Sequence, residues 1–126
     1  MTTKVIENQQ MPEALGPYSQ AVAASGELVF ISGQAGIDPL SGEIPAEFDR
    51  QARNAFENLS RIVRTAGLTM TDVVKTTVYL ADASQFGVLN ELFGEFFPKS
   101  PPTRAVPIVQ LPKGLLISIE AIAVRS

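Results

Sequence analysis

A ten-residue, mainly apolar stretch close to the end of the chain, residues 115–124, restricts the fold more than any other feature. Side chains of a β-strand alternate between two faces. One face would carry Leu115, Ile117, Ile119, Ala121 and Ala123, and the other would carry Leu116, Ser118, Glu120, Ile122 and Val124. Both faces are mainly apolar, so both need cover from other parts of the protein.

Two amphipathic segments predict the helices that cover one of these faces. From Phe48 to Ala66 apolar residues recur at three- and four-residue spacing, and Gly67 is well placed to end that helix in a left-handed conformation. A second such pattern begins at Phe86, after Asp82 or Ser84 as a cap, and Pro98 ends it. The remaining face then requires cover from a second subunit, unless the strand end lies under loops.

The other segments predict strands. They are Thr3–Ile6, residues 20–24, residues 28–32, Val73–Leu80 and residues 103–109. Gly26-Glu27 predicts a hairpin between the second and third of them, and Pro107 restricts the fifth to a sheet edge or a bulge. The order β-β-β-α-β-α-β-β predicts an α+β fold with a mixed sheet and two helices on one face. No linker or repeat interrupts residues 1–126, which predicts a single domain.

Composition excludes several kinds of chemistry. The 126-residue sequence contains neither cysteine nor histidine, which excludes disulfides, Cys/His zinc sites, and Cys–His or Ser–His dyads. Acid–base chemistry must then use carboxylates, Lys, Tyr, backbone or water. A net charge of −3 without a basic run argues against nucleic acid as a partner. A polar N-terminus and the lack of a long apolar run predict neither a signal peptide nor a membrane span, so a cytoplasmic location is expected.

Two charged residues in apolar surroundings are candidates for a functional site. Glu120 is the one carboxylate in the last strand, and is either an exposed residue near a sheet edge or a carboxyl prepared for proton transfer. Arg104 is the one charge in a long proline-bounded apolar stretch. Its guanidinium either binds a carboxylate in a bidentate manner or reaches water while the stem packs. The residues alone do not choose between these alternatives.

Further residues indicate a function only when they are taken together. They occur in the motifs Gly16-Pro17-Tyr18-Ser19-Gln20-Ala21, Ser32-Gly33-Gln34, Asp72-Val73-Val74-Lys75-Thr76-Thr77-Val78, Asn90-Glu91, Phe96-Phe97, Leu111-Pro112-Lys113 and Glu120-Ala121-Ile122-Ala123, together with Arg104. In order and spacing this set resembles the Rid/YjgF family of reactive-intermediate deaminases over nearly the whole chain. The resemblance implies a chorismate-mutase-like fold, a homotrimer with active sites between subunits, and hydrolysis of 2-imino acids or their enamine tautomers to 2-keto acids and ammonia. It implies no cofactor and no metal.

The resemblance also assigns roles to individual residues. Arg104 would hold the substrate carboxylate, and Glu120 would position and activate the attacking water. The cleft would be lined by Tyr18, Ser32, Gly33, Asn90 and the backbone N–H of Val106. Many family members have a small polar residue or cysteine where this chain has Val106, and Pro107 is also unusual. The alternative functions are a non-catalytic binding or regulatory trimer and a ribonuclease or translation inhibitor.

Overall fold

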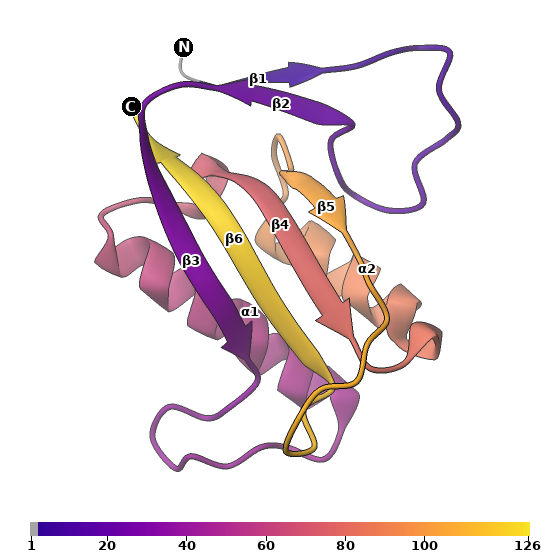
Figure 1. The fold of residues 1–126 in the computed structure, drawn as a ribbon, viewed down its shortest axis with the longest axis vertical. Helices are drawn as coiled ribbons and strands as arrows, with labels where there is room; N and C mark the ends of the chain where they lie inside the picture. Colours follow the sequence, from indigo (N-terminus) through magenta and orange to yellow (C-terminus); the bar gives the residue numbers. More distant parts are fainter. Residues whose placement is uncertain (1–2) are drawn as a thin grey trace.

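The computed structural model describes residues 3–126, coloured along the chain in Figure 1. The strands are β1 (Thr3–Ile6), β2 (Ala21–Ala24), β3 (Glu27–Ala35), β4 (Val73–Leu80), β5 (Thr103–Ala105) and β6 (Ile117–Arg125). The helices are α1 (Phe48–Thr65) and α2 (Phe86–Phe96), with short 3-10 turns η1 (Met70–Asp72) and η2 (Ala83–Gln85). Within residues 3–126 no helix is both long and apolar enough to cross a membrane.

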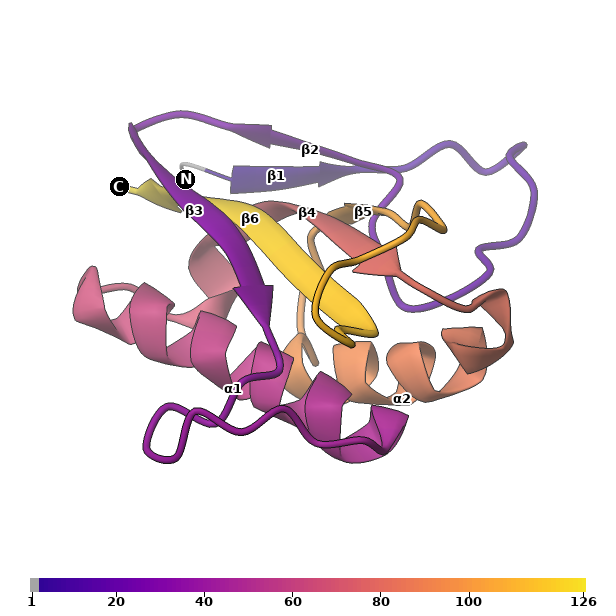
Figure 2. The ribbon, with the colours of Figure 1, turned by 60° about the horizontal axis from the view of Figure 1, so that its bottom comes forward.

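The main sheet has the strand order β3-β6-β4-β5, in which β4 and β5 are parallel and the other pairs antiparallel. Both helices lie on the same face of this sheet (Figure 2). The predicted α+β fold, with a mixed sheet and two helices on one face, is therefore confirmed. No helix of residues 3–126 covers the opposite side, called here the open face.

The core lies between this sheet and the two helices. Strand β6 contributes Ile117, Ile119, Ala121 and Ala123, all buried, while Ser118, Glu120 and Ile122 face the open side and are only partly buried. Helix α1 buries the apolar face that its spacing predicts, although Ile62 remains exposed. Its Phe56 packs edge-on against Phe93 of α2 with ring centroids 6.1 Å apart. This contact packs the two helices against each other.

Several predicted boundaries are confirmed. Gly67 has a φ of 79°, the left-handed conformation that closes α1 after Ala66. Asp82 accepts a hydrogen bond from the Ser84 N–H at 2.8 Å, so it caps the η2 turn and not α2 as expected, since α2 begins after Gln85 without a side-chain cap. Helix α2 ends at Phe96, two residues before Pro98.

Two predictions are wrong. The expected hairpin at Gly26-Glu27 does not form, because β2 pairs with β1 and β3 pairs with β6. Gly26 instead makes a corner, with a φ of 134°, where a Cβ would collide with the Arg125 carbonyl. The expected strand over residues 103–109 ends at Ala105 and resumes only as a bridge between Leu80 and Ile108. Pro107 has no N–H to continue the ladder.

Candidate active site

Arg104 lies at the edge of the sheet, on the side that faces the helices. It is opposite Thr76 of β4, and Thr76 is fully buried. Its Nη1 donates a hydrogen bond to Asn90 Oδ1 on α2 at 2.8 Å. The guanidinium carbon is 5.1 Å from the ring centroid of Tyr18, 5.2 Å from that of Phe86 and 5.0 Å from that of Phe93. Three aromatic rings and one amide therefore hold this cation.

Among residues 3–126 the cation has no acidic partner. In the part of the chain that the structure describes, the ion pairs are Arg53–Glu95 and Arg125–Glu27, and neither involves Arg104. Burial lowers the pKa of Arg104, because a low-dielectric setting disfavours the charged form, but a guanidinium remains protonated at neutral pH. A partly buried cation that contacts only neutral groups favours binding of an anion. A carboxylate fits its planar fork.

A loop before β2 closes around this cation. Asn90 Nδ2 donates to the Leu15 carbonyl at 3.0 Å, so the same amide binds both Arg104 and the loop. Gly16 permits this approach: a Cβ on it would lie 2.6 Å from Arg104 Nη2 and closer still to Asn90 Oδ1. The loop is also tied to the residues before β5, because Ser19 hydrogen-bonds to Pro101 and Pro102. Segments far apart in the sequence thus meet at Arg104.

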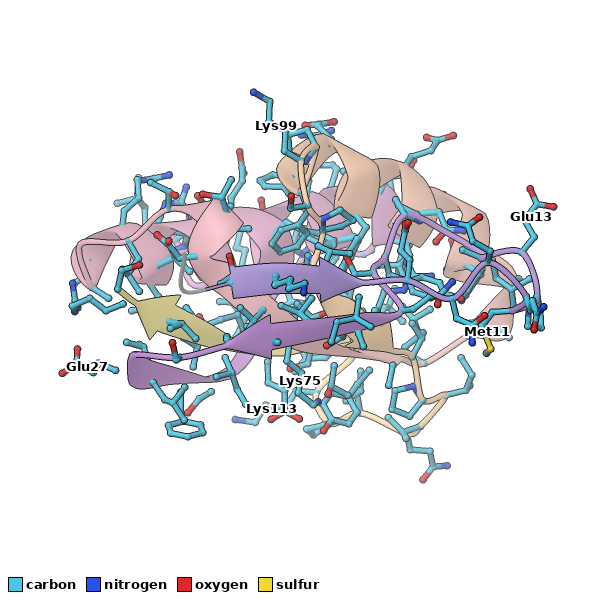
Figure 3. The ribbon with its side chains drawn as sticks, turned by 90° about the horizontal axis from the view of Figure 1, so that it is seen from above. Met11, Glu13, Glu27, Lys75, Lys99 and Lys113 are labelled. Carbon is cyan, nitrogen blue, oxygen red and sulfur yellow. The ribbon has the colours of Figure 1, made fainter. Side chains whose placement is uncertain are left out.

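Glu120 lies on the open face in the middle of β6. It pairs with Thr77 of β4, and its Oε1 accepts a hydrogen bond from the Tyr79 hydroxyl at 2.5 Å. A hollow of about 180 Å³ lies beside it, lined by Phe30, Ile31, Lys75, Thr77, Glu120, Ala121 and Ile122. Figure 3 shows Lys75 on the side of the sheet away from the helices. The surroundings of Glu120 therefore combine apolar and polar groups.

Ser32 and Gly33 belong to the Glu120 side. The pairing of β3 with β6 shifts between Ile31, opposite Ala121, and Gln34, opposite Ile119, so these two residues form a bulge across from Glu120. A Cβ on Gly33 would lie 2.7 Å from Ser118 Oγ. The bulge thus presents exposed backbone next to the carboxylate.

The predicted site residues therefore form two groups. Tyr18, Asn90 and Arg104 meet on the helix side, whereas Ser32, Gly33 and Glu120 meet on the open face. Adjacent residues of β4 separate them, since Thr76 is opposite Arg104 and Thr77 is opposite Glu120. One chain by itself does not place Arg104 and Glu120 in a common cleft.

Some neighbours of these groups were absent from the sequence-based prediction. Phe86 and Phe93 contact Arg104, and with Asn90 they occupy positions i, i+4 and i+7 of α2, a spacing that places them on one helix face. That spacing is readable from the sequence. Tyr79 was also missed, and no local pattern reveals its contact, because it depends on the register of β4 and β6. Val106, predicted to line the cleft, is partly exposed and packs against the core.

Comparison with known proteins gives a consistent result. A family model described as Endoribonuclease L-PSP matches residues 8–125. The 2-iminobutanoate/2-iminopropanoate deaminase of Mus musculus is 45% identical over 124 residues, which cover 97% of this chain and 91% of the relative.

Solved structures agree. TdcF from Escherichia coli, with bound serine, is 45% identical, has a TM-score of 0.75, and covers 98% of this chain and 99% of its own. YyfB of Yersinia pestis, a protein of the Rid family, has a TM-score of 0.89 at 27% identity and covers 99% of this chain and all of its own, 100%.

Proposed function

This chain belongs to the Rid/YjgF family of reactive-intermediate deaminases, and we propose that it hydrolyses 2-imino acids to 2-keto acids and ammonia in the cytoplasm. The observation that carries the proposal is Arg104, a partly buried cation held by neutral groups and without an acidic partner among residues 3–126. Every 2-imino acid has a carboxylate next to its reacting carbon, so this cation supplies a suitable anchor.

Arg104 acts first, by orienting the substrate. Two parallel N–H groups of the guanidinium bind the two carboxylate oxygens, which fixes the adjacent imine carbon in space. Asn90 fixes the guanidinium through its hydrogen bond to Nη1. Tyr18, Phe86 and Phe93 keep water away from the ion pair. An imine carbon is already electrophilic, so no covalent nucleophile is required.

Glu120 then handles the protons. Its carboxylate accepts a proton from water while the water oxygen bonds to the carbon of the protonated imine, giving a neutral tetrahedral amino alcohol. The carboxyl group returns the proton to nitrogen, the C–N bond breaks as the C=O bond forms, and the departing ammonia takes the hydroxyl proton and leaves as ammonium. Atoms and charges balance without any cofactor. The chemistry uses only side chains that this sequence contains.

The two groups of residues must come from different subunits for this mechanism to operate. Arg104 faces the helices and Glu120 faces the open side of the same sheet, which supports a site between chains of a homotrimer. Exposed apolar residues on the open face, among them Phe30 with 71% of its surface accessible, also favour coverage by another subunit. Light scattering should report about three chains per particle at micromolar concentration.

The direct test generates imines from amino acids with an amino-acid oxidase and follows release of keto acid and ammonia. Purified protein should accelerate this release from several small 2-imino acids. A rate equal to that of imine in buffer would refute the proposed activity.

Subunit mixing tests the location of the site. The variants Arg104→Ala and Glu120→Gln are each expected to be inactive, but each retains the residue that the other lacks. After the two are unfolded and refolded together in equal amounts, random assembly should restore about one quarter of the parental activity, because one site in four combines an intact Arg104 with an intact Glu120 from a neighbour. No recovery in a mixed, folded trimer would place both residues in the same chain's site.

A further inference from the structure

The hydroxyl group of Tyr79 contacts the proposed general base. Tyr79 is on β4, two residues beyond Thr77, which pairs directly with Glu120. This diagonal position lets a long side chain reach across the strands. Its hydroxyl donates a hydrogen bond of 2.5 Å to Glu120 Oε1. A hydrogen bond to a charged acceptor is stronger than one between neutral groups.

The carboxylate of Glu120 has few other partners. Among residues 3–126 the Tyr79 hydroxyl supplies its one hydrogen bond. Lys75 is the other charged residue that lines the hollow, but its Nζ donates to Thr77 Oγ1 at 3.2 Å. The neighbouring strand β3 contributes apolar Phe30 and Ile31 to this hollow. Within residues 3–126, the Tyr79 hydroxyl is therefore the hydrogen-bond donor that restrains the rotation of the carboxylate.

We propose that Tyr79 is a positioning residue for hydrolysis: it holds Oε1 of Glu120 so that Oε2 is directed at the attacking water. This inference rests on the proposed deaminase function. A glutamate has three rotatable side-chain bonds, and a general base must lie within hydrogen-bond reach of the proton it accepts. Fixing one oxygen removes much of this freedom before substrate binds.

The protonation of Tyr79 agrees with this role. The hydrogen bond to Glu120 is the main cause that raises the pKa of Tyr79 above its ordinary value, and burial and the charge of Glu120 raise it further. The hydroxyl thus keeps its proton at neutral pH and remains a donor.

The first arm of the test compares Tyr79→Phe with the parent. Phenylalanine keeps the ring and removes only the hydroxyl. We expect kcat to fall about tenfold, as loss of one charged hydrogen bond would cause. KM should stay unchanged, because Arg104 binds the carboxylate. The control is Ser60→Ala, which removes an α1 hydroxyl bonded to Arg64 and should leave both constants unchanged. Adding Tyr79→Phe to a Glu120→Gln chain should cause little further loss.

The second arm needs no activity. The chain has two tyrosines and no tryptophan, so a Tyr18→Phe variant reports Tyr79 alone in an alkaline absorbance titration. Tyr79 should ionise at a higher pH than free tyrosine, and adding Glu120→Gln to this variant should lower that pH. Equal titration of Tyr79 with and without the Glu120→Gln change would overturn the contact. If the parent is active and Tyr79→Phe has the same kcat, the positioning role is refuted while the deaminase function stands. An inactive parent would instead refute the deaminase function, and with it any role of Tyr79 in hydrolysis.

Discussion

Arg104 and Glu120 flank the same strand, β4, yet their surroundings are opposite in kind. Arg104 is enclosed by Tyr18, Phe86 and Phe93 and bonded to an amide of its own chain. Glu120 lies on an open sheet face beside exposed Phe30. The binding half of the proposed site is thus complete within one chain, whereas the catalytic half lies on a surface that lacks cover. From this difference we expect a single chain to bind a carboxylate without hydrolysing an imine.

The largest expected effect comes from removing the binding half. Arg104→Ala should nearly abolish both imine hydrolysis and 2-keto acid binding, by about 10³-fold in kcat/KM, because both the charge and the fork are lost. Arg104→Lys should retain only a minor part, since an ammonium is a point donor. Calorimetric titration with a 2-keto acid measures binding separately from turnover.

Thermal melting is the control for this variant. A folded Arg104→Ala protein with full activity would show that neither substrate binding nor hydrolysis requires this cation. A protein that loses activity and folding together would make Arg104 a structural residue, and a non-catalytic binding function would then be the better explanation.

The catalytic half should respond differently. Glu120→Gln keeps the shape of the side chain but removes the proton acceptor, so kcat should fall by about 10²-fold while keto-acid binding persists. Single-turnover kinetics beside a binding titration separates these effects. If Glu120→Gln turned over at the parental rate, Glu120 would not be the general base, and another group would have to activate the water.

A milder perturbation tests how tightly the binding half is packed. Gly16→Ala would place a methyl group 2.6 Å from Arg104 Nη2, which forces the loop or the guanidinium to shift. We expect KM to rise about tenfold with a smaller change in kcat. The matched control is Gly87→Ala in α2, where a Cβ meets nothing within 4 Å and alanine favours the helix. If Gly16→Ala and Gly87→Ala have the same KM, the loop does not constrain Arg104.

The smallest expected effect is on stability and concerns the ion pair that joins α1 to α2. Arg53 donates two hydrogen bonds to Glu95, at 2.6 and 3.0 Å, and this contact lowers the pKa of the Glu95 carboxyl. A lowered pKa means that the contribution to stability is present above the unfolded-state value and is lost as pH falls through the folded value. The Tm of the parent should fall between about pH 6 and pH 3 as this contribution is lost. In Arg53→Ala that fall should be smaller, by about 2 °C or less, because the pair is exposed. An unchanged pH dependence would show that the pair contributes nothing.

Much of the architecture could be predicted from local patterns. The three- and four-residue spacing from Phe48 to Ala66 predicted α1, and the β-branched run predicted β4 with the bounds observed, Val73–Leu80. The errors fell where pairing partners are distant in sequence. The residues on both sides of Gly26 have the pattern of a hairpin, but β2 pairs with β1 and β3 pairs with β6.

The sequence by itself determined which elements form and which residues carry charge into apolar segments, because periodicity and side-chain chemistry are local properties. It identified Arg104, Glu120, Tyr18 and Asn90 as candidates. Only the tertiary structure decided that Arg104 joins Tyr18 and Asn90 on the helix side, and that Glu120 meets Tyr79 on the open face. The physical reason is register: alternation within a strand assigns each side chain to a face, but which residues of β4, β5 and β6 lie opposite one another depends on pairing between segments that are distant in sequence.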